Sequence, residues 1–462
     1  MTEAQRSPLS VVILAAGQGT RMRSHLPKVL HGLAGRPLLG HVIGTAQALD
    51  AAAIHVVYGH GGEQVREVLG LPAVNWIEQT EQLGTGHAVA QATPAVPADH
   101  RVLVLYGDVP LITAETLRHL VAAGGSGAVS LLTAELADPQ GYGRIVRGVD
   151  GNVLGIVEQK EATPQQLAIH EINTGMMSVP AKSLQQWLAR LGNDNAQGEY
   201  YLTDIIAMAV ADGVAVHTVR APSEDEILGV NDRVQLAYLE RRYQLRQAEK
   251  LMRAGVTLSD PARIDIRGTV EAGLDVVVDI DVILEGRVVL GDNVRVGAHC
   301  LLKETEVGAG AVIHPHSVVE QAVIGPGCQV GPFARIRPDT VLEAGARVGN
   351  FVEIKKSTVG EGSKINHLSY VGDAIIGREA NIGAGCITCN YDGANKHQTV
   401  VGDRAFIGSD TQLVAPVEVG ADAVIGAGST ITRAAPPGEL TVSRARQTTI
   451  RGWKRPQKKP SR

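Results

Sequence analysis

The sequence contains few aromatic residues and few cysteines for its length. Only 3% of its 462 residues are Phe, Trp or Tyr, and the four cysteines, Cys300, Cys328, Cys386 and Cys389, all lie in the second half. In a reducing compartment we expect all four to be free thiols, and Cys386 and Cys389 to be packing residues. Cys386 and Cys389 have the spacing of a metal-binding pair, but a zinc site is not expected, because no second Cys or His pair follows nearby.

The sequence also lacks a strong net charge and a long apolar run. Its formal charge is −5 and its basic run, 454–462, is confined to the C-terminus, so we expect no broad basic surface for nucleic acid. No stretch approaches the ~20 apolar residues that a membrane helix needs, and the run 11–16 is too short for the core of a signal peptide. These absences predict a cytoplasmic protein without membrane insertion.

Apolar residues and glycine are abundant by contrast. Hydrophobic residues make up 44% of the chain, and glycine accounts for 53 residues. A chain of this length is expected to form two or three domains. Small aliphatic residues between frequent glycines are typical of a repeat fold with many tight turns.

The first half of the sequence alternates between apolar runs and amphipathic stretches. Four apolar runs predict strands, at 10–16, 53–58, 101–106 and 127–133. Helices are expected at 40–49, at 114–123 and directly after the glycine-rich segment 17–22. The alternation predicts a Rossmann-like α/β domain over residues 1–232, with ligands bound at the carboxyl ends of largely parallel strands. A charged amphipathic stretch, 233–254, predicts a helical arm that joins this domain to the next.

Beyond about Gly255 the sequence repeats every six residues. The clearest series of aliphatic residues is Ile407, Leu413, Val419, Ile425 and Ile431. Such a series is typical of a hexapeptide-repeat parallel β-helix, in which equivalent aliphatic side chains stack from coil to coil. We therefore expect a β-helix over residues 255–462, with the polar interruption 388–399 on a binding surface.

The glycine-rich segment after the first strand has the features of a phosphate site. Its glycines are not spaced as in the dinucleotide fingerprint or the P-loop, but they would let backbone N–H groups approach phosphate oxygens, while Arg21 and Lys28 add positive charge. Taken alone, the segment is equally compatible with a tight turn that bears a solvated Arg and Lys. Asp108, which follows the strand 101–106, favours the phosphate site over a role as a helix cap, because magnesium on a nucleotide needs oxygen ligands.

Motifs from both halves together resemble those of one enzyme family. The segments 14–22 with Pro27-Lys28, 82–87, 106–110 and 141–144 have the order and spacing of the bacterial bifunctional N-acetylglucosamine-1-phosphate uridyltransferase/glucosamine-1-phosphate N-acetyltransferase family. The resemblance implies a bifunctional enzyme of UDP-N-acetylglucosamine synthesis, which feeds peptidoglycan and lipopolysaccharide precursors. The first half would transfer UMP from UTP to N-acetylglucosamine-1-phosphate with magnesium. The second half, a left-handed β-helix in this family, would transfer acetyl from acetyl-CoA to glucosamine-1-phosphate.

The resemblance also implies the residues of the first site. Arg21 and Lys28 would be catalytic by neutralising charge on the transferring phosphate, and Asp108 and Asn231 would hold magnesium. UTP and the sugar nucleotide would be bound by the matching positions Leu14, Ala15, Ala16, Gly17, Lys28, Gln79, Gly84, Thr85, Tyr106, Gly107, Asp108, Gly143, Glu158, Asn173 and Asn231. The implied reaction is a direct attack of the sugar phosphate on the α-phosphorus of UTP, in which positioning and charge neutralisation carry the catalysis.

The second site is implied in the same way. His367 matches the general base of the family, and a neutral imidazole can accept a proton from an attacking amine at cellular pH. Glucosamine-1-phosphate would be bound by Arg337, Lys355, Tyr370 and Asn381. Acetyl-CoA would be bound by Ala384, Asn390, Tyr391, Ser409, Ala427 and Arg444. Because the family assembles through its β-helices, with acetyl sites built from more than one subunit, we expect a homotrimer.

Two alternatives remain open at this point. The first is a sugar nucleotidyltransferase with one activity, whose β-helix only regulates or oligomerises, as in the ADP-glucose-forming enzymes; it leaves His367 and Asn390-Tyr391 unexplained. The second is a non-catalytic binding or exchange-factor subunit with both folds. Such a subunit is expected to have lost Lys28 or Asp108, and both are present.

Overall fold

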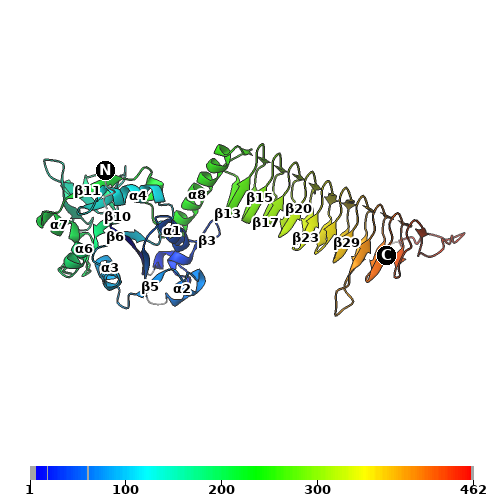
Figure 1. The fold of residues 1–462 in the computed structure, drawn as a ribbon, viewed down its shortest axis with the longest axis horizontal. Helices are drawn as coiled ribbons and strands as arrows, with labels where there is room; N and C mark the ends of the chain where they lie inside the picture. The colour runs from blue at the N-terminus through cyan, green and yellow to red at the C-terminus, as the bar shows by residue number, and fades with distance from the viewer. Residues whose placement is uncertain (1–6, 18, 60–61, 459–462) are drawn as a thin grey trace. The chain divides into compact units, whose positions relative to one another are not determined.

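The computed structural model describes residues 7–17, 19–59 and 62–458, so Gln18 of the glycine-rich segment and residues 459–462 of the basic tail lie outside it. The chain divides into two compact units, Met1–Tyr243 and Gln244–Arg462, each with its own elements (Figure 1). Within the described ranges, no helix combines the length and the apolar character needed to cross a membrane.

A mixed sheet forms the centre of the N-terminal unit. Its main strands, in spatial order, are β11 (Val216–Arg220), β7 (Val129–Glu135), β10 (Glu171–Pro180), β6 (Arg101–Tyr106), β1 (Leu9–Ala15), β4 (Ala53–Tyr58) and β5 (Asn75–Glu78). Strands β6, β1, β4 and β5 are parallel, whereas β10 is antiparallel to β6 and β7. Two further strands, β8 (Arg144–Arg147) and β9 (Val153–Val157), form a hairpin beside β10. The predicted Rossmann-like α/β fold is confirmed.

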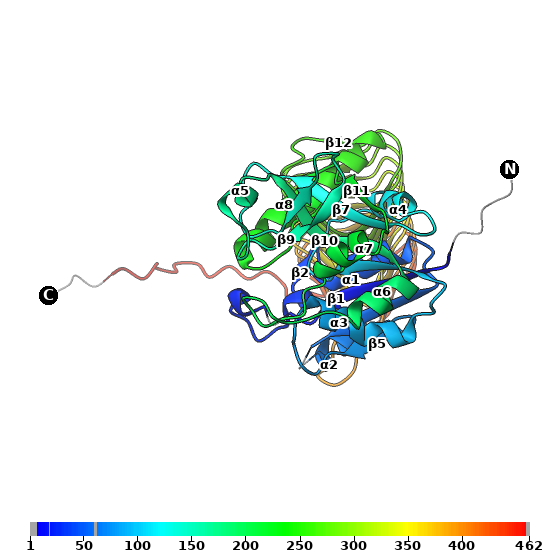
Figure 2. The ribbon, with the colours of Figure 1, turned by 90° about the vertical axis from the view of Figure 1, so that its left-hand side faces the viewer.

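Helices cover both faces of this sheet (Figure 2). One core joins Val11 and Ile13 of β1 to α1 (Leu38–Gln47), α2 (Glu63–Leu69) and α4 (Ala114–Ala123). A second core joins Val12 and Leu14 to α3 (Thr85–Ala92), α6 (Ala181–Leu188) and α7 (Asp204–Ala211). A strand that is buried on both faces needs a continuous apolar run, and β1 has one.

The structure corrects one prediction for this unit, because no α-helix directly follows the glycine-rich segment. Thr20–Met22 and Lys28–Leu30 form single 3-10 turns instead, and the first α-helix begins at Leu38. Gly19 and Arg23 adopt left-handed backbone angles on either side of the first turn, and His31 is extended (φ −60°, ψ 136°) after the second, so neither turn propagates into a helix. The segment is an open loop rather than a helix N-terminus.

A single helix, α8 (Arg233–Arg253), contains the boundary between the two units. Its N-terminal part belongs to the first unit, where Leu239 is buried with Leu33 and Leu38. Its C-terminal part belongs to the second unit, where Ala248 joins the apolar core of the coils. The side chain of Gln244 also makes two hydrogen bonds to the backbone of Ile266, at 2.7 and 3.0 Å.

The C-terminal unit consists of short parallel strands, from β12 (Thr257–Leu258) to β38 (Leu440–Thr441), that stack coil on coil (Figure 1). The register repeats regularly: Lys364 pairs with Arg347 in the preceding coil and with Asn381 in the following one. The aliphatic residues of the six-residue series are all buried, namely Ile407, Leu413, Val419, Ile425 and Ile431. The arrangement fits the predicted left-handed parallel β-helix.

Small side chains fill the inner corners of the coils. One buried row contains Cys300, Ser317, Ala334, Val352, Ser369, Cys386, Thr411 and Ser429. Two of them donate to the neighbouring coil: Ser369 Oγ donates to the carbonyl of Gly383 at 3.2 Å, and Cys386 Sγ donates to the carbonyl of Gly408 at 3.2 Å. Ser317 Oγ, by contrast, is buried without a hydrogen-bond partner in the described structure. Burial raises the pKa of the Cys386 thiol. All four cysteines are free, as predicted. Cys386 is buried, as expected of a packing residue, whereas Cys389 is only half-buried; Cys300 and Cys328 are buried as well.

Candidate active sites

A cavity of about 530 Å³ opens at the carboxyl ends of β1 and β6. Ten of the predicted UTP-site residues line it: Leu14, Ala15, Ala16, Gly17, Lys28, Gln79, Gly84, Thr85, Tyr106 and Asp108. Ligands bind at this edge of an α/β sheet because the loops after parallel strands meet there. The fold therefore brings together residues that the sequence separates.

A hydrogen bond and a tightly packed glycine fix the wall of this cavity. Gln82 Nε2 donates a hydrogen bond of 2.7 Å to the carbonyl of Ala16, which ties the segment before α3 to the glycine-rich loop. Gly84 has a φ of +106°, and a Cβ there would lie 2.8 Å from the carbonyl oxygen of Tyr200. Only glycine fits such a position without displacing the backbone. This wall is therefore preformed.

Charged and amide groups from three distant segments meet at the mouth of the cavity. The ammonium of Lys28 forms an ion pair with the Asp108 carboxylate and lies 3.3 Å from Asn231 Oδ1. Arg21 Nη2 donates to the same Asn231 oxygen at 3.0 Å. The backbone fixes this meeting point, because the amide of Val230 donates to the carbonyl of Asp108 at 2.9 Å. The predicted catalytic and metal-binding residues of the first unit thus form one cluster.

A second cavity, of about 330 Å³, adjoins this cluster. It shares Tyr106 and Asp108 with the first cavity, and Arg21 and Asn231 also line it. Burial raises the pKa of Tyr106, and the charges of Asp108 and Glu158 raise it further. The phenol therefore stays protonated and can donate a hydrogen bond where the two cavities meet.

Four predicted UTP-site residues do not line these two cavities: Gly107, Gly143, Glu158 and Asn173. The amide of Gly107 donates to the carbonyl of Leu14 at 2.9 Å, and Gly143 accepts from the amide of Asn173 at 2.9 Å. Glu158 accepts from Thr203 Oγ1 at 3.1 Å, and burial raises the pKa of Glu158. Their hydrogen bonds hold the backbone near the cavities, and the charge of Glu158 raises the pKa of Tyr106.

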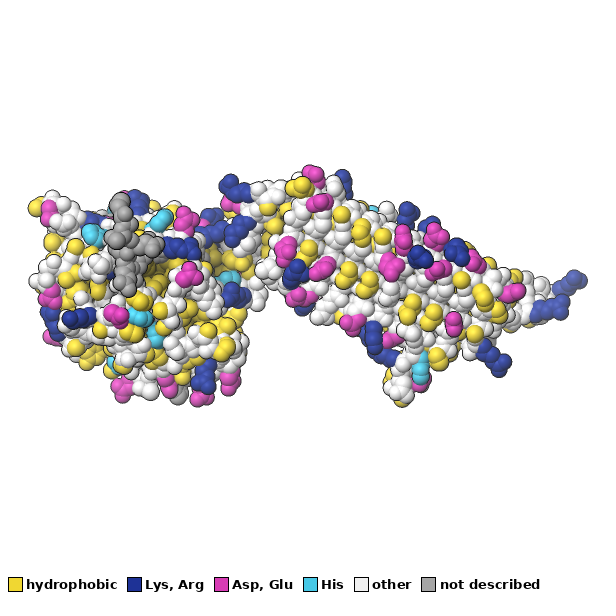
Figure 3. All heavy atoms as spheres, in the orientation of Figure 1, with side chains coloured by type: hydrophobic (Ala, Val, Ile, Leu, Met, Phe, Trp, Pro, Cys, Tyr) yellow, Lys and Arg dark blue, Asp and Glu magenta, His cyan; other side chains and the backbone are white. Residues whose placement is uncertain are grey.

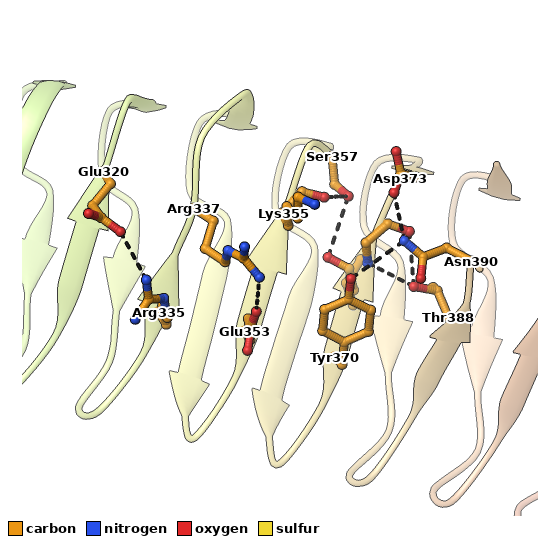
Figure 4. Close-up of polar contacts among 12 residues, drawn as sticks. Glu320, Arg335, Arg337, Glu353, Lys355, Ser357, Tyr370, Asp373, Thr388 and Asn390 are labelled. Carbon is orange, nitrogen blue, oxygen red and sulfur yellow. Dashed lines mark hydrogen bonds and ion pairs between the residues drawn. The ribbon is translucent and has the colours of Figure 1, made fainter. Parts of the chain in front are cut away.

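Arg337 and Lys355 lie on one face of the β-helix (Figure 4), and Lys396 contacts Lys355. Arg337 Nη1 donates to Glu353 Oε1 at 2.7 Å, and Lys355 ends the same strand, β25 (Glu353–Lys355). Contact with Lys396 lowers the pKa of Lys355, and the charge of Arg337 lowers it further. A group of this kind favours an anion such as a phosphate.

His367 ends β27 (Lys364–His367), one corner before β28 (Tyr370–Gly372). Its Nδ1 lies 3.0 Å from Oδ1 of Asn350, which holds the equivalent position in the preceding coil. An amide oxygen can only accept, so Nδ1 carries the proton and Nε2 is left as the acceptor. The exposed imidazole therefore has Nε2 as its acceptor nitrogen.

In the coils after that of His367, small residues occupy the equivalent position and form a row. The carbonyls of Ala384 and Ser409 each accept a hydrogen bond of 2.8 Å from the next coil, from the amide that follows Ser409 and the amide that follows Ala427, respectively. Arg444 Nη1 donates to the carbonyl of Ala427 at 2.5 Å and closes the row. The predicted residues Asn381 and Tyr391 also lie in this region, the first in β30 (Asn381–Ile382) and the second, exposed, in the loop after β31 (Ile387–Cys389).

Comparison with known proteins identifies the family. The bifunctional protein GlmU of Marinobacter nauticus is 59% identical to this chain, over 98% of this chain and 100% of its own length. The GlmU proteins of Methylococcus capsulatus and Pseudomonas entomophila are each 59% identical over 97% of this chain, and over 97% and 99% of their own lengths. The chain belongs to the GlmU family.

Matches to domain families assign a type of domain to each half of this GlmU-family chain. Residues 11–148 match the MobA-like NTP transferase domain, and residues 398–433 match six repeats of the bacterial transferase hexapeptide family. The ranges 266–345 and 326–415 also match the GMPPB C-terminal domain. The chain is a bifunctional enzyme whose two domains match the predicted uridyltransferase and acetyltransferase activities. These matches favour the bifunctional enzyme over both alternatives.

Several residues at these sites of the GlmU-family chain were not predicted from its sequence. Gln82 lies in the motif 82–87, but no function was assigned to it. Asn350 holds the same position in its coil as His367 does in the next, so counting along the repeat could have identified it. Glu199, which lines the first cavity, carries no local signal, and tertiary folding alone brings it to the site. Gln235 accepts from the amide of Asn231 at 2.7 Å, only four residues away at the start of α8, so this contact is local in the sequence.

Proposed function

We propose that residues 1–232 transfer UMP from UTP to N-acetylglucosamine-1-phosphate, and that residues 255–462 transfer acetyl from acetyl-CoA to glucosamine-1-phosphate, with 233–254 as the arm between them. The product of the second reaction is the acceptor of the first, so one chain would complete a cytoplasmic route to UDP-N-acetylglucosamine. The observation that carries this proposal is that each unit holds its own set of polar groups suited to one of the two reactions.

The two adjoining cavities support the assignment of the first reaction. The nucleotide would occupy the larger cavity and the sugar the smaller one, so the reacting phosphates would meet near Tyr106 and Asp108, which line both. A Cβ built at Gly17 would have no atom within 4 Å, so phosphate can approach the open backbone of the loop. Lys28 and Arg21 would offset the charge on the transferring group and the leaving pyrophosphate.

Magnesium fits the oxygen atoms of the same cluster. The ammonium of Lys28 already bridges the carboxylate of Asp108 and the amide oxygen of Asn231, so these two oxygens form a cation-binding pair. Within the described part of the chain, no group of three or more Asp, Glu, His or Cys side chains could hold a metal by itself. Phosphate oxygens of the substrates would complete the coordination, as is common for magnesium. When bound, the ion would neutralise charge on the transferring phosphoryl group.

For acetyl transfer, His367 would act as general base through Nε2. It would accept a proton from the amine of glucosamine-1-phosphate as the nitrogen attacks the thioester carbonyl, and the CoA thiolate would leave. Arg337 and Lys355, with Tyr370 and Asn381, would bind the sugar phosphate. Acetyl-CoA would lie along the row of small residues, with contacts to Ala384, Asn390, Tyr391, Ser409, Ala427 and Arg444.

We further propose that the chain assembles as a homotrimer through the β-helix. Val323, Val341 and Ile375 are exposed on strands of one sheet, and Phe333 stacks on Phe351 with ring centroids 5.2 Å apart. Exposed apolar side chains are visible over the β-helix (Figure 3). Such groups are typical of interfaces between subunits. Light scattering on the purified protein should give three times the mass of one chain.

One reaction mixture tests the proposed function. The purified protein should convert glucosamine-1-phosphate, acetyl-CoA, UTP and magnesium into UDP-N-acetylglucosamine. Omission of acetyl-CoA should abolish the product, and N-acetylglucosamine-1-phosphate should restore it. A protein that uses N-acetylglucosamine-1-phosphate but never acetylates glucosamine-1-phosphate would contradict the proposal and favour the enzyme with one activity.

A further inference from the structure

A buried carboxylate without a role in the reactions above lies beside the candidate acetyl-transfer residues. Asp373 occupies the corner between β28 and β29 (Ala374–Ile376), and only 9% of it is exposed. Its Oδ2 accepts a hydrogen bond of 2.6 Å from Asn390 Nδ2 (Figure 4). Its Oδ1 lies 3.5 Å from the ammonium of Lys356, whose side chain is largely exposed.

Asp373 also contacts both ends of the loop 390–398, which projects from the coils (orange in Figure 1). Its carboxylate binds Asn390 at the start of the loop, and its backbone carbonyl accepts from the amide of Thr399, just after the loop, at 3.2 Å. The loop is closed by a hydrogen bond of 2.8 Å from the amide of His397 to the carbonyl of Asn390. Asp373 therefore holds the base of the loop that carries Tyr391 and Lys396.

The carboxylate of Asp373 fixes the direction of a short chain of hydrogen bonds. An ionised carboxylate can only accept, so Asn390 must turn its Nδ2 toward Asp373. The same Nδ2 donates to Tyr370 Oη at 3.4 Å. Because Oη accepts from Asn390, its own proton must be donated elsewhere. The Tyr370 hydroxyl is thus left with its proton to donate to another acceptor.

We propose that Asp373 is a positioning residue for acetyl transfer, which orients Asn390 so that Tyr370 donates its hydroxyl proton to an oxygen of the bound sugar phosphate. A phosphate monoester offers acceptor oxygens, and the neighbouring cations Lys355 and Arg337 favour the same kind of group. An isosteric amide at position 373 could donate as well as accept, so it would no longer fix the orientation of Asn390. This inference rests on the proposed acetyltransferase function.

The test measures steady-state kinetics of acetyl transfer for Asp373→Asn in two backgrounds. In the parent background, the KM for glucosamine-1-phosphate should rise roughly 5-fold to 30-fold, as expected for the loss of one hydrogen bond to a charged ligand, while kcat changes less. In the Tyr370→Phe background, which has no hydroxyl to orient, Asp373→Asn should change KM by less than about 2-fold. Uridylyl transfer should equal that of the parent in all variants.

Two further variants keep the test decisive. Lys356→Ala, which removes the other side-chain partner of Asp373, should leave KM near the parent value. Asp373→Ser is measured in the same two backgrounds as Asp373→Asn, so that a folding defect in one replacement does not decide the outcome. An equal rise in KM in both backgrounds would assign Asp373 a structural role only, and an unchanged KM would also overturn the inference. Absence of acetyl transfer by the parent itself would instead overturn the proposed function, and the inference with it.

Discussion

The two units of this chain build their candidate sites in different ways. In the sheet, Lys28, Asp108 and Asn231 come from three distant segments and meet because the whole fold brings them together. In the β-helix, Asn350 and His367 meet because they hold the same position in adjacent coils. A coil contacts mainly its neighbours, so that site depends on local stacking. We therefore expect the two activities to be separable by substitution.

The largest separation should come from His367→Ala. Loss of the general base should lower acetyl transfer roughly 100-fold to 10,000-fold, while uridylyl transfer to supplied N-acetylglucosamine-1-phosphate stays normal. Lys364→Ala, on the outer face of the same strand, is the matched control and should retain acetyl transfer. Both activities, the melting curve and the oligomer size are measured on one preparation. A well-folded His367→Ala protein with acetyl transfer within a few-fold of the parent would refute the role of the base.

The reverse separation should come from Asp108→Ala. Removal of this oxygen donor should lower uridylyl transfer by about 100-fold to 1,000-fold at limiting magnesium, because less charge is neutralised on the transferring group. Acetyl transfer should be unchanged. Glu135→Gln alters an exposed carboxylate of the same sheet and should have little effect. If Asp108→Ala formed the sugar nucleotide at the parent's rate, the metal assignment would be wrong.

A cavity in the β-helix tests how locally that unit depends on its coils. Ile365 is fully buried in β27, and Ile365→Ala should cost about 2–5 kcal/mol of stability. Acetyl transfer should fall, since the cavity lies between the coils that hold Asn350 and His367, and uridylyl transfer should persist. The exposed neighbour Lys364, changed to Ala, should cost no more than about 0.5 kcal/mol. Stability is measured by chemical denaturation, and both activities are assayed on the same preparation. A parallel loss of acetyl transfer and uridylyl transfer would contradict local dependence.

The smallest effect concerns pH and the first unit. His55 is buried in β4, neither of its ring nitrogens has a hydrogen-bond partner within the described structure, and burial and the nearby His100 lower its pKa. Below the unfolded-state pKa of about 6.5, the unfolded chain binds the proton more readily than the folded one, so stability falls as the pH drops. We expect the melting temperature of the uridyltransferase unit to fall by about 2–4 °C between pH 7.5 and 5.5.

His55→Val is the variant that isolates this effect. It removes the titrating ring while keeping a β-branched residue in a buried strand, so its melting temperature should depend less on pH than that of the parent. Scanning calorimetry at both pH values checks this expectation. Identical pH dependence in the two proteins would show that another group is responsible.

The same difference between the units explains what the sequence could predict. Six-residue spacing identified the inward residues of the β-helix, such as Ile407 and Ile425, because each coil repeats the physical environment of the last. The strand 101–106 was also predicted with its bounds, since an apolar run between polar turns is a local signal. The helix expected after the glycine-rich loop was wrong, because left-handed angles at Gly19 and Arg23 end the turn. The position of Glu199 at the first cavity depends on tertiary folding and leaves no pattern in the sequence.

The most direct test of two separable sites is a complementation experiment with two variants that are purified separately. From glucosamine-1-phosphate, acetyl-CoA, UTP and magnesium, neither Asp108→Ala nor His367→Ala alone should form UDP-N-acetylglucosamine at more than about 1% of the parent's rate. A mixture should form it, because the Asp108 variant releases N-acetylglucosamine-1-phosphate that the His367 variant can use. A mixture as inactive as its components, although both are folded, would contradict two independent sites in one chain.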